Sequence, residues 1–173
     1  MKKNLWAKTI LYVYKYLENI ADAIDRMIDR QALNSFYYSS SNQTDNGVLA
    51  VSERIIELGE RKKKLINIKV LADRALETCE IENAQILIEK YIDGGKSDEI
   101  ALRHEMPVRT YFRRLVQAEE EFLFQLATYG YTENKITEYL KGEKWINEVY
   151  NRFLCKSAVE NDEISEYQLL RAI

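Results

Sequence analysis

The chain has 173 residues, of which one is proline and six are glycine, so few residues interrupt long helices. Lysine and arginine number 25 against 28 acids, a net charge of −3, and the isoelectric point is about 5.4. The chain as a whole therefore lacks the positive charge that indicates nucleic-acid binding, and any basic surface must be local. The single histidine, His104, excludes a metal site built on two histidines of one chain.

The apolar N-terminus is interrupted by Lys8, Lys15 and Glu18, and no signal-peptide cleavage site follows it. No window reaches the roughly 18 uncharged apolar residues of a membrane span. Cys79 and Cys155 are far apart in sequence, which favours reduced thiols over a disulfide framework. We therefore expect a soluble, cytoplasmic protein that does not bind membranes.

Apolar residues recur at steps of three and four from Leu5 to about Leu33 and again from about Val48 to Cys79, which predicts two long amphipathic helices. The segment between them, residues 34–47, is rich in Ser, Asn and Thr and is predicted to be a connecting loop. Two long helices joined by a loop indicate an antiparallel hairpin.

A third helix is predicted over Ile81–Ile92, ended by Asp93-Gly94-Gly95 in the manner of a glycine C-cap. Ser97 is a good N-cap for a short helix that follows. Pro107 is expected to be the first residue of the next helix, which covers residues 107–129 and ends at Gly130.

Two or three further helical segments, interrupted at Gly142, are predicted for residues 130–173. No sustained alternation of apolar and polar residues indicates a strand, so the predicted fold is all-α. We divide the chain into a helical hairpin at 1–79 for oligomerisation or partner binding, a DNA-binding module at 80–129 and a C-terminal helical extension at 130–173. Three aromatic residues of this extension are predicted to pack in the core or against a partner rather than to stack on bases: Trp145, Tyr150 and Phe153.

The most specific stretch runs from Lys96 to Phe122 and has the pattern of a helix-turn-helix. Ala101 is small enough to let the two helices approach each other, and Met106 is placed to fill the turn. At about 100° per residue, the second helix has two sides. The apolar side is formed by Val108, Tyr111, Phe112, Leu115, Ala118 and Phe122.

The other side of this helix, with its flanks, is basic and polar, and it carries Arg109, Thr110, Arg113, Arg114 and Gln117. No acid lies between Met106 and Ala118 in a chain that is acidic overall. Arginine reads guanine edges or binds phosphates, glutamine reads adenine edges, and threonine contacts phosphate or a thymine methyl. We expect these residues to face the major groove, with Lys96 and Arg103 on the DNA backbone. The acidic run at residues 119–121 indicates that the contact ends near Gln117.

The same pattern has interpretations that involve no sequence-specific regulation. Arginines on an amphipathic helix are often merely solvated, and helix-turn-helix geometry also occurs in proteins that bind no DNA. The acidic net charge and the long hairpin favour a helical adaptor protein of this kind. A DNA-packaging subunit similar to a small terminase is a further alternative. No nucleophile or phosphate-binding motif is complete, so we expect no enzyme, no cofactor and no metal.

The run Tyr91–Leu115 resembles region 4 of bacterial sigma factors, and it is more similar to sigma-like phage and prophage regulators of the ArpU and RinA type. The matching motifs are a helix end, a core and a recognition helix, here Tyr91-Ile92-Asp93-Gly94, Glu99-Ile100-Ala101 and Arg109-Thr110-Tyr111-Phe112-Arg113-Arg114. The chain departs from the family at Glu105, where glycine is common, and at Pro107, where Ser or Thr is usual. The resemblance implies a transcriptional regulator of phage genes that binds double-stranded DNA. The hairpin would then supply a dimer interface or a contact with RNA polymerase.

Overall fold

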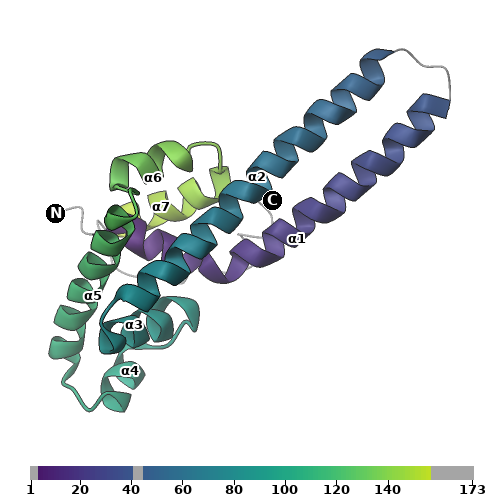
Figure 1. Cartoon of the computed structure of the whole chain (residues 1–173). Coiled ribbons are helices and arrows are strands. Elements are labelled where there is room, and N and C mark those ends of the chain that lie inside the picture. The colour runs from purple at the N-terminus through teal and green to yellow at the C-terminus, as the bar shows by residue number, and fades with distance from the viewer. Residues whose placement is uncertain (1–3, 41–44, 157–173) are drawn as a thin grey trace. The chain divides into compact units, whose positions relative to one another are not determined.

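The computed structural model describes residues 4–40 and 45–156, and all regular structure within these ranges is helical (Figure 1). The prediction of an all-α fold is therefore confirmed for the part of the chain that is described. A π-helical turn, η1 (Ile88–Ile92), continues the third helix. The α-helices are α1 (Leu5–Ser40), α2 (Asp45–Thr78), α3 (Ile81–Leu87), α4 (Ser97–Arg103), α5 (Val108–Thr128), α6 (Glu133–Tyr139) and α7 (Lys144–Lys156).

Both long helices extend further into the segment that connects them than the composition of this segment predicts. The predicted loop at 34–47 is wrong for residues 34–40, which continue α1, and for residues 45–47, which begin α2. Residues 41–44 lie outside the described residues. Ser, Asn and Tyr reduce helix stability by only about 0.5 kcal/mol each relative to alanine, and no Pro or Gly lies between Leu33 and Ser40 to stop α1.

The backbone divides into two compact units, one of Met1–Lys15 with Leu71–Ile173 and one of Tyr16–Val70. In the second unit α1 and α2 run antiparallel. Two ion pairs show this, since Glu18 pairs with Lys69 and the later residue Asp25 pairs with the earlier residue Lys62. Aliphatic residues of both helices form its core: Leu17, Ile20, Ala21 and Ile24 from α1, and Leu58, Leu65 and Ile68 from α2.

The first unit has an aromatic core that joins the beginning of α1 to α6 and α7. The Trp6 indole Nε1 donates a hydrogen bond of 2.9 Å to Thr137 Oγ1, and the Trp6 ring lies 4.5 Å from that of Tyr150. Phe153 contacts Tyr12 edge to face, and Trp145 is fully buried. The packing role predicted for Trp145, Tyr150 and Phe153 is therefore confirmed.

The glycine stop predicted after the third helix is confirmed, because Gly94 has a φ of +73°, a left-handed value that favours glycine. Ser97, however, is the first residue of α4 and not its N-cap, so that prediction is wrong. The N-cap is Lys96, which makes no side-chain capping hydrogen bond. The Ser97 hydroxyl instead accepts a hydrogen bond of 3.0 Å from the half-buried ammonium of Lys90. Burial lowers the pKa of Lys90.

Helix α4 ends in a Schellman motif that uses glutamate where glycine is usual. The amide of Met106 donates to the Ala101 carbonyl at 3.0 Å, and the amide of Glu105 donates to the Leu102 carbonyl at 3.1 Å. Glu105 occupies the left-handed position with a φ of +51°. Pro107 follows as the N-cap of α5 with an extended ψ of 141°, so α5 begins at Val108, one residue later than predicted.

Helix α5 also ends in a Schellman motif, and here the left-handed position is occupied by glycine, the residue that adopts this conformation without strain. The amide of Tyr131 donates to the Leu126 carbonyl at 3.0 Å, and Gly130 takes the left-handed position with a φ of +85°. The predicted end of this helix at Gly130 is therefore confirmed. The two motifs differ in that Glu105 carries a Cβ in a conformation that disfavours it.

We predict that Glu105→Gly raises the free energy of unfolding by about 0.5–1 kcal/mol, since relief of left-handed strain exceeds the added entropy of a glycine in the unfolded chain. Urea denaturation followed by circular dichroism measures the change. The control is Glu105→Ala, which removes the same charge but keeps the Cβ atom. A glycine variant no more stable than the alanine variant would contradict the prediction.

Candidate nucleic-acid interface

Helix α5 has a buried side that matches most of the apolar side predicted from its sequence. The buried residues are Tyr111, Leu115, Ala118, Glu119, Phe122 and Leu126. Two predicted members of the apolar side are exposed instead, Val108 to 41% and Phe112 to 49%. Phe112 is rotated by about 100° from the buried Tyr111, and Val108 lies in the first turn of the helix, which is incompletely covered. The predicted apolar side of α5 is therefore buried except at these two residues.

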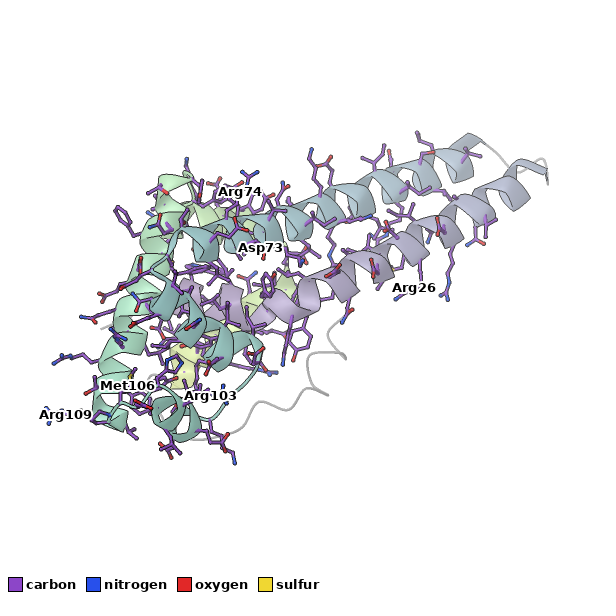
Figure 2. All side chains as sticks on the ribbon, turned by 60° about the horizontal axis from the view of Figure 1, so that its bottom comes forward. Arg26, Asp73, Arg74, Arg103, Met106 and Arg109 are labelled. Carbon is purple, nitrogen blue, oxygen red and sulfur yellow. The ribbon has the colours of Figure 1, made fainter. Side chains whose placement is uncertain are left out.

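The opposite side of α5 is a surface of exposed polar and basic side chains, which we call the basic face: Arg109, Thr110, Arg113 and Gln117. Neither Arg109 nor Arg113 forms an ion pair with any acid in the described ranges. Figure 2 shows Arg109 near the beginning of α5, with its side chain directed away from the ribbon. The guanidinium groups of the basic face are thus available for an external anion.

The other basic residues predicted to contact DNA each have an acidic partner in the chain. Arg114, on the flank of α5, bonds to Glu82 of α3. Arg103 donates a hydrogen bond of 2.9 Å to Glu89. The third residue, Lys96, is highly exposed and lies 3.7 Å from Glu99. Their charges are therefore partly compensated, in contrast to those of the basic face.

Arg103 and His104 also line a pocket of about 460 Å³ beside η1, together with Gln85, Ile88, Glu89 and Asp93. His104 is the C-cap of α4, and its Nε2 lies 3.4 Å from Glu89 Oε1. Acidic and basic groups are mixed in this pocket. The described residues contain no cluster of three or more His, Cys, Asp or Glu that could hold a metal ion.

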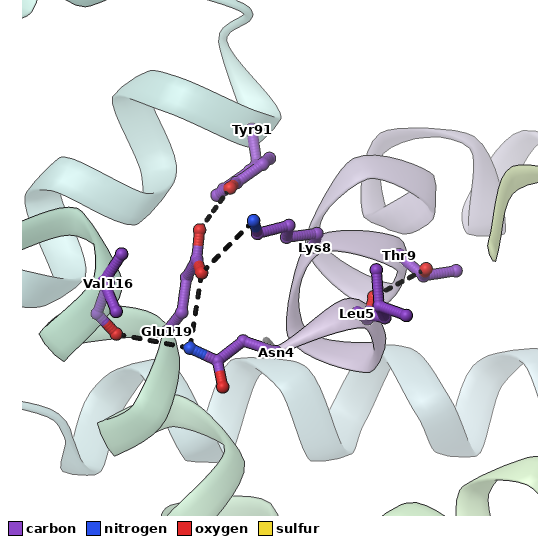
Figure 3. A network of polar contacts seen from close by, with 7 residues as sticks. All are labelled: Asn4, Leu5, Lys8, Thr9, Tyr91, Val116 and Glu119. Carbon is purple, nitrogen blue, oxygen red and sulfur yellow. Dashed lines mark hydrogen bonds and ion pairs between the residues drawn. The ribbon is translucent and has the colours of Figure 1, made fainter. Parts of the chain in front are cut away.

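Beneath the basic face, the buried carboxylate of Glu119 connects α5 to two other segments (Figure 3). Glu119 is 1% exposed and accepts a hydrogen bond from the Tyr91 hydroxyl of η1. The amide Nδ2 of Asn4 lies 3.4 Å from Glu119 Oε2 and 3.4 Å from the Val116 carbonyl oxygen. The ammonium of Lys8 lies 3.7 Å from the same carboxylate. This network holds α5 against the beginning of α1 and against η1.

The composition of the acidic run at residues 119–121 indicates one exposed surface. The structure shows instead that these acids do not form one. Glu121 accepts hydrogen bonds of 2.9 Å from the Glu80 amide and 2.7 Å from Asn83. Of the three acids, only Glu120 is exposed. The helical spacing does place Glu119 between Leu115 and Phe122 on the buried side, and this spacing is the signal by which its burial could have been anticipated.

Burial raises the pKa of Glu119 above its ordinary value of 4.5, although hydrogen bonding to Tyr91 and the charge of Lys8 oppose the increase. Burial beside Glu119 also raises the pKa of Tyr91. The folded protein therefore binds a proton at Glu119 more readily than the unfolded chain does. The stability that this proton contributes is present below about pH 4.5 and is lost as the pH rises through the raised pKa.

We predict that Glu119→Gln becomes more stable relative to the wild type as the pH rises from about 4 to 8, because glutamine carries no titrating charge. Urea unfolding of both proteins across this range measures the difference in the free energy of unfolding. If the altered hydrogen bonds of the variant lower its free energy of unfolding, this loss is the same at every pH and does not change the trend. A difference that is independent of pH, or that favours the wild type increasingly at high pH, would refute the prediction.

Within the described residues, no helix combines the length and the apolar character needed to cross a membrane. Comparison of the chain with models of protein families, with curated proteins and with solved structures finds no match. Any function therefore has to be inferred from the chemistry of the basic face and its surroundings.

Proposed function

We propose that this protein is a sequence-specific DNA-binding transcriptional regulator that inserts α5 into the major groove of double-stranded DNA. The observation that carries the proposal is the pair of exposed arginines, Arg109 and Arg113, which have no acidic partner in the described part of the chain. They lie one turn apart in the N-terminal half of a helix that follows a tight turn. Recognition helices contact bases with this half.

The residue types of the basic face suit base recognition as well as phosphate binding. Arg109, Arg113 and Gln117 are spaced by four residues, so they form a line along one side of α5. Arginine pairs with both acceptors of guanine, and glutamine pairs with adenine in the same manner. Thr110, beside this line, can contact a phosphate or a thymine methyl. This surface can therefore read a short sequence.

The geometry of α4 and α5 supports their assignment as a helix-turn-helix. Ala101 is buried and belongs to the helix that packs on α5, as the small residue of such a contact should be. The resemblance to sigma region 4 leads us to expect glycine in the turn, and Glu105 indeed has a backbone conformation that favours glycine. This agreement supports the proposal that the protein is related to sigma-like phage and prophage regulators.

The partly compensated cations supply the DNA-backbone contacts in this proposal. Lys96, Arg103 and Arg114 would exchange their acidic partners for phosphates when DNA binds. A single module of this kind binds DNA weakly, so the protein acts as a dimer. Its α1–α2 hairpin supplies either the dimer interface or a contact with RNA polymerase. An acidic chain with a small basic face on α5 fits this arrangement, because two copies double the positive charge that meets the DNA.

We predict that Arg109→Ala with Arg113→Ala lowers the affinity for a mixed-sequence duplex by roughly tenfold for each arginine and makes its salt dependence shallower. Fluorescence anisotropy between about 50 and 200 mM salt measures both effects. The slope of log K against log[salt] should decrease by about 0.9 for each phosphate that the variant no longer neutralises. Selection of binding sites from a random duplex library then identifies the preferred sequence.

The matched control is Arg26→Ala with Arg74→Ala, which removes two exposed arginines of the long helices (Figure 2) and changes the net charge equally. This control should bind almost as well as the wild type. Equal affinities of the two double variants would exclude α5 as the recognition helix. A wild-type protein that binds no duplex at low salt would leave the alternative of a helical adaptor protein.

A further inference from the structure

Helix α2 has a row of residues along its outer side, spaced alternately by three and four positions and all exposed except the half-buried Gly59. We call this row the outer stripe: Leu49, Ser52, Ile56, Gly59, Lys63, Ile66 and Val70. Its four large apolar members are exposed to 60%, 66%, 40% and 41% in chain order. Alternate steps of three and four are the a and d positions of a coiled coil. The outer stripe is about 30 Å long at 1.5 Å per residue.

The inner side of α2 is already occupied within the hairpin. Leu58, Leu65 and Ile68 are buried in the core that α2 forms with α1. A helix that is apolar on one side needs one neighbour, whereas a helix that is apolar on two sides needs two. Helix α1 accounts for the inner side only, so the outer stripe points to a second neighbouring helix.

Gly59 lies at the middle of the outer stripe, and neither a close contact nor the backbone conformation within the described structure requires a glycine there. A Cβ atom added at this position would meet no atom within 4 Å, and its φ is not left-handed. Glycine inside a helix costs about 1 kcal/mol relative to alanine. A glycine at the centre of an apolar row allows another helix to approach closely at that point.

The charges beside the outer stripe change sign along the helix. Glu53 and Glu60 flank its N-terminal half, whereas Lys63 is a member of its C-terminal half. None of Glu53, Glu60 and Lys63 has an ion-pair partner among the described residues. A second α2 in antiparallel orientation would bring Lys63 of each helix between Glu53 and Glu60 of the other. A parallel orientation would instead place the Lys63 side chains of the two copies against each other.

We propose that the outer stripe binds the outer stripe of a second copy of this chain, in an antiparallel pair with its two-fold axis beside Gly59. Leu49 then packs against Val70 of the partner subunit. Lys63 lies across Ile56 of the partner subunit, and its ammonium lies between the acids that flank that residue. The interface specifies the dimer of the proposed function. It requires no DNA, so the two proposals can fail separately.

The first test is the oligomeric state of the full chain by sedimentation equilibrium. The wild type should be a dimer, and Ile56→Lys should weaken the dimer at least tenfold. Ile81→Lys is the matched control, because Ile81 is an isoleucine of α3 that is 76% exposed and lies outside the outer stripe. A monomeric wild type, or an Ile56→Lys dimer as strong as the control, would overturn the proposal. Circular dichroism verifies that each variant is folded.

The second test uses the charges of the interface. Lys63→Glu leaves three acids at positions 53, 60 and 63, whereas Glu53→Lys with Glu60→Lys leaves three bases there. Each variant alone should be mainly monomeric, and an equimolar mixture should form a heterodimer, because both sets of contacts are then restored. Two variants that remain dimeric alone, or a mixture that stays monomeric, would refute the assigned contacts.

The orientation follows from crosslinking in a Cys155→Ser background, where the remaining cysteine, Cys79, is buried with a pKa raised to about 12. Leu49→Cys should form an intermolecular disulfide with Val70→Cys when the two variants are mixed and oxidised. Each variant alone should not, since positions 49 and 70 lie about 30 Å apart along one helix. Self-crosslinking of Leu49→Cys would indicate a parallel pair and would overturn the antiparallel one.

Discussion

A carboxylate inside the protein determines where α5 can lie. Glu119 is enclosed on the buried side of the helix, and a buried charge without partners is far more costly than an exposed one. Its partners come from two segments that are distant from it in sequence: Asn4 and Lys8 at the beginning of α1, and Tyr91 in η1. Because they must all reach one side chain, the beginning of α1 and the π-helical turn are held at fixed positions beside α5. The basic face on the opposite side of α5 is oriented as a result.

The same helix therefore has two electrostatic roles, separated by its own diameter. On the inside, the buried acid Glu119 is stabilised by a nearby lysine and by hydrogen bonds. On the outside, arginines remain without acids in the described ranges. The overall charge of −3 says nothing about this separation, since it sums charges that lie on different sides of the same elements. Local charge is what a phosphate backbone encounters, because exposed charges beyond roughly 10 Å are screened at physiological salt.

The periodicity of the sequence was sufficient to predict the helices and the buried side of α5, since both depend on local spacing. Tyr111, Leu115, Ala118 and Phe122 follow the helical repeat and are buried as predicted. Composition misled where propensities are weak, as at residues 34–40, and the capping role of Ser97 was lost to a lysine that approaches from η1. The partners of Glu119 could not be predicted, because Asn4 lies 115 residues away in the chain. Contacts of that kind depend on the tertiary fold and leave no local pattern.

The compact unit that contains α5 is discontinuous, because the chain leaves it at Lys15 and returns to it at Leu71. The hairpin between these points has the character of an insertion whose two arms pair with each other. Antiparallel arms return the chain to its starting point whatever their length, so whole helical turns can be added to or removed from both arms together. The length of the hairpin is therefore a variable on which evolution can act independently of the module that would meet DNA.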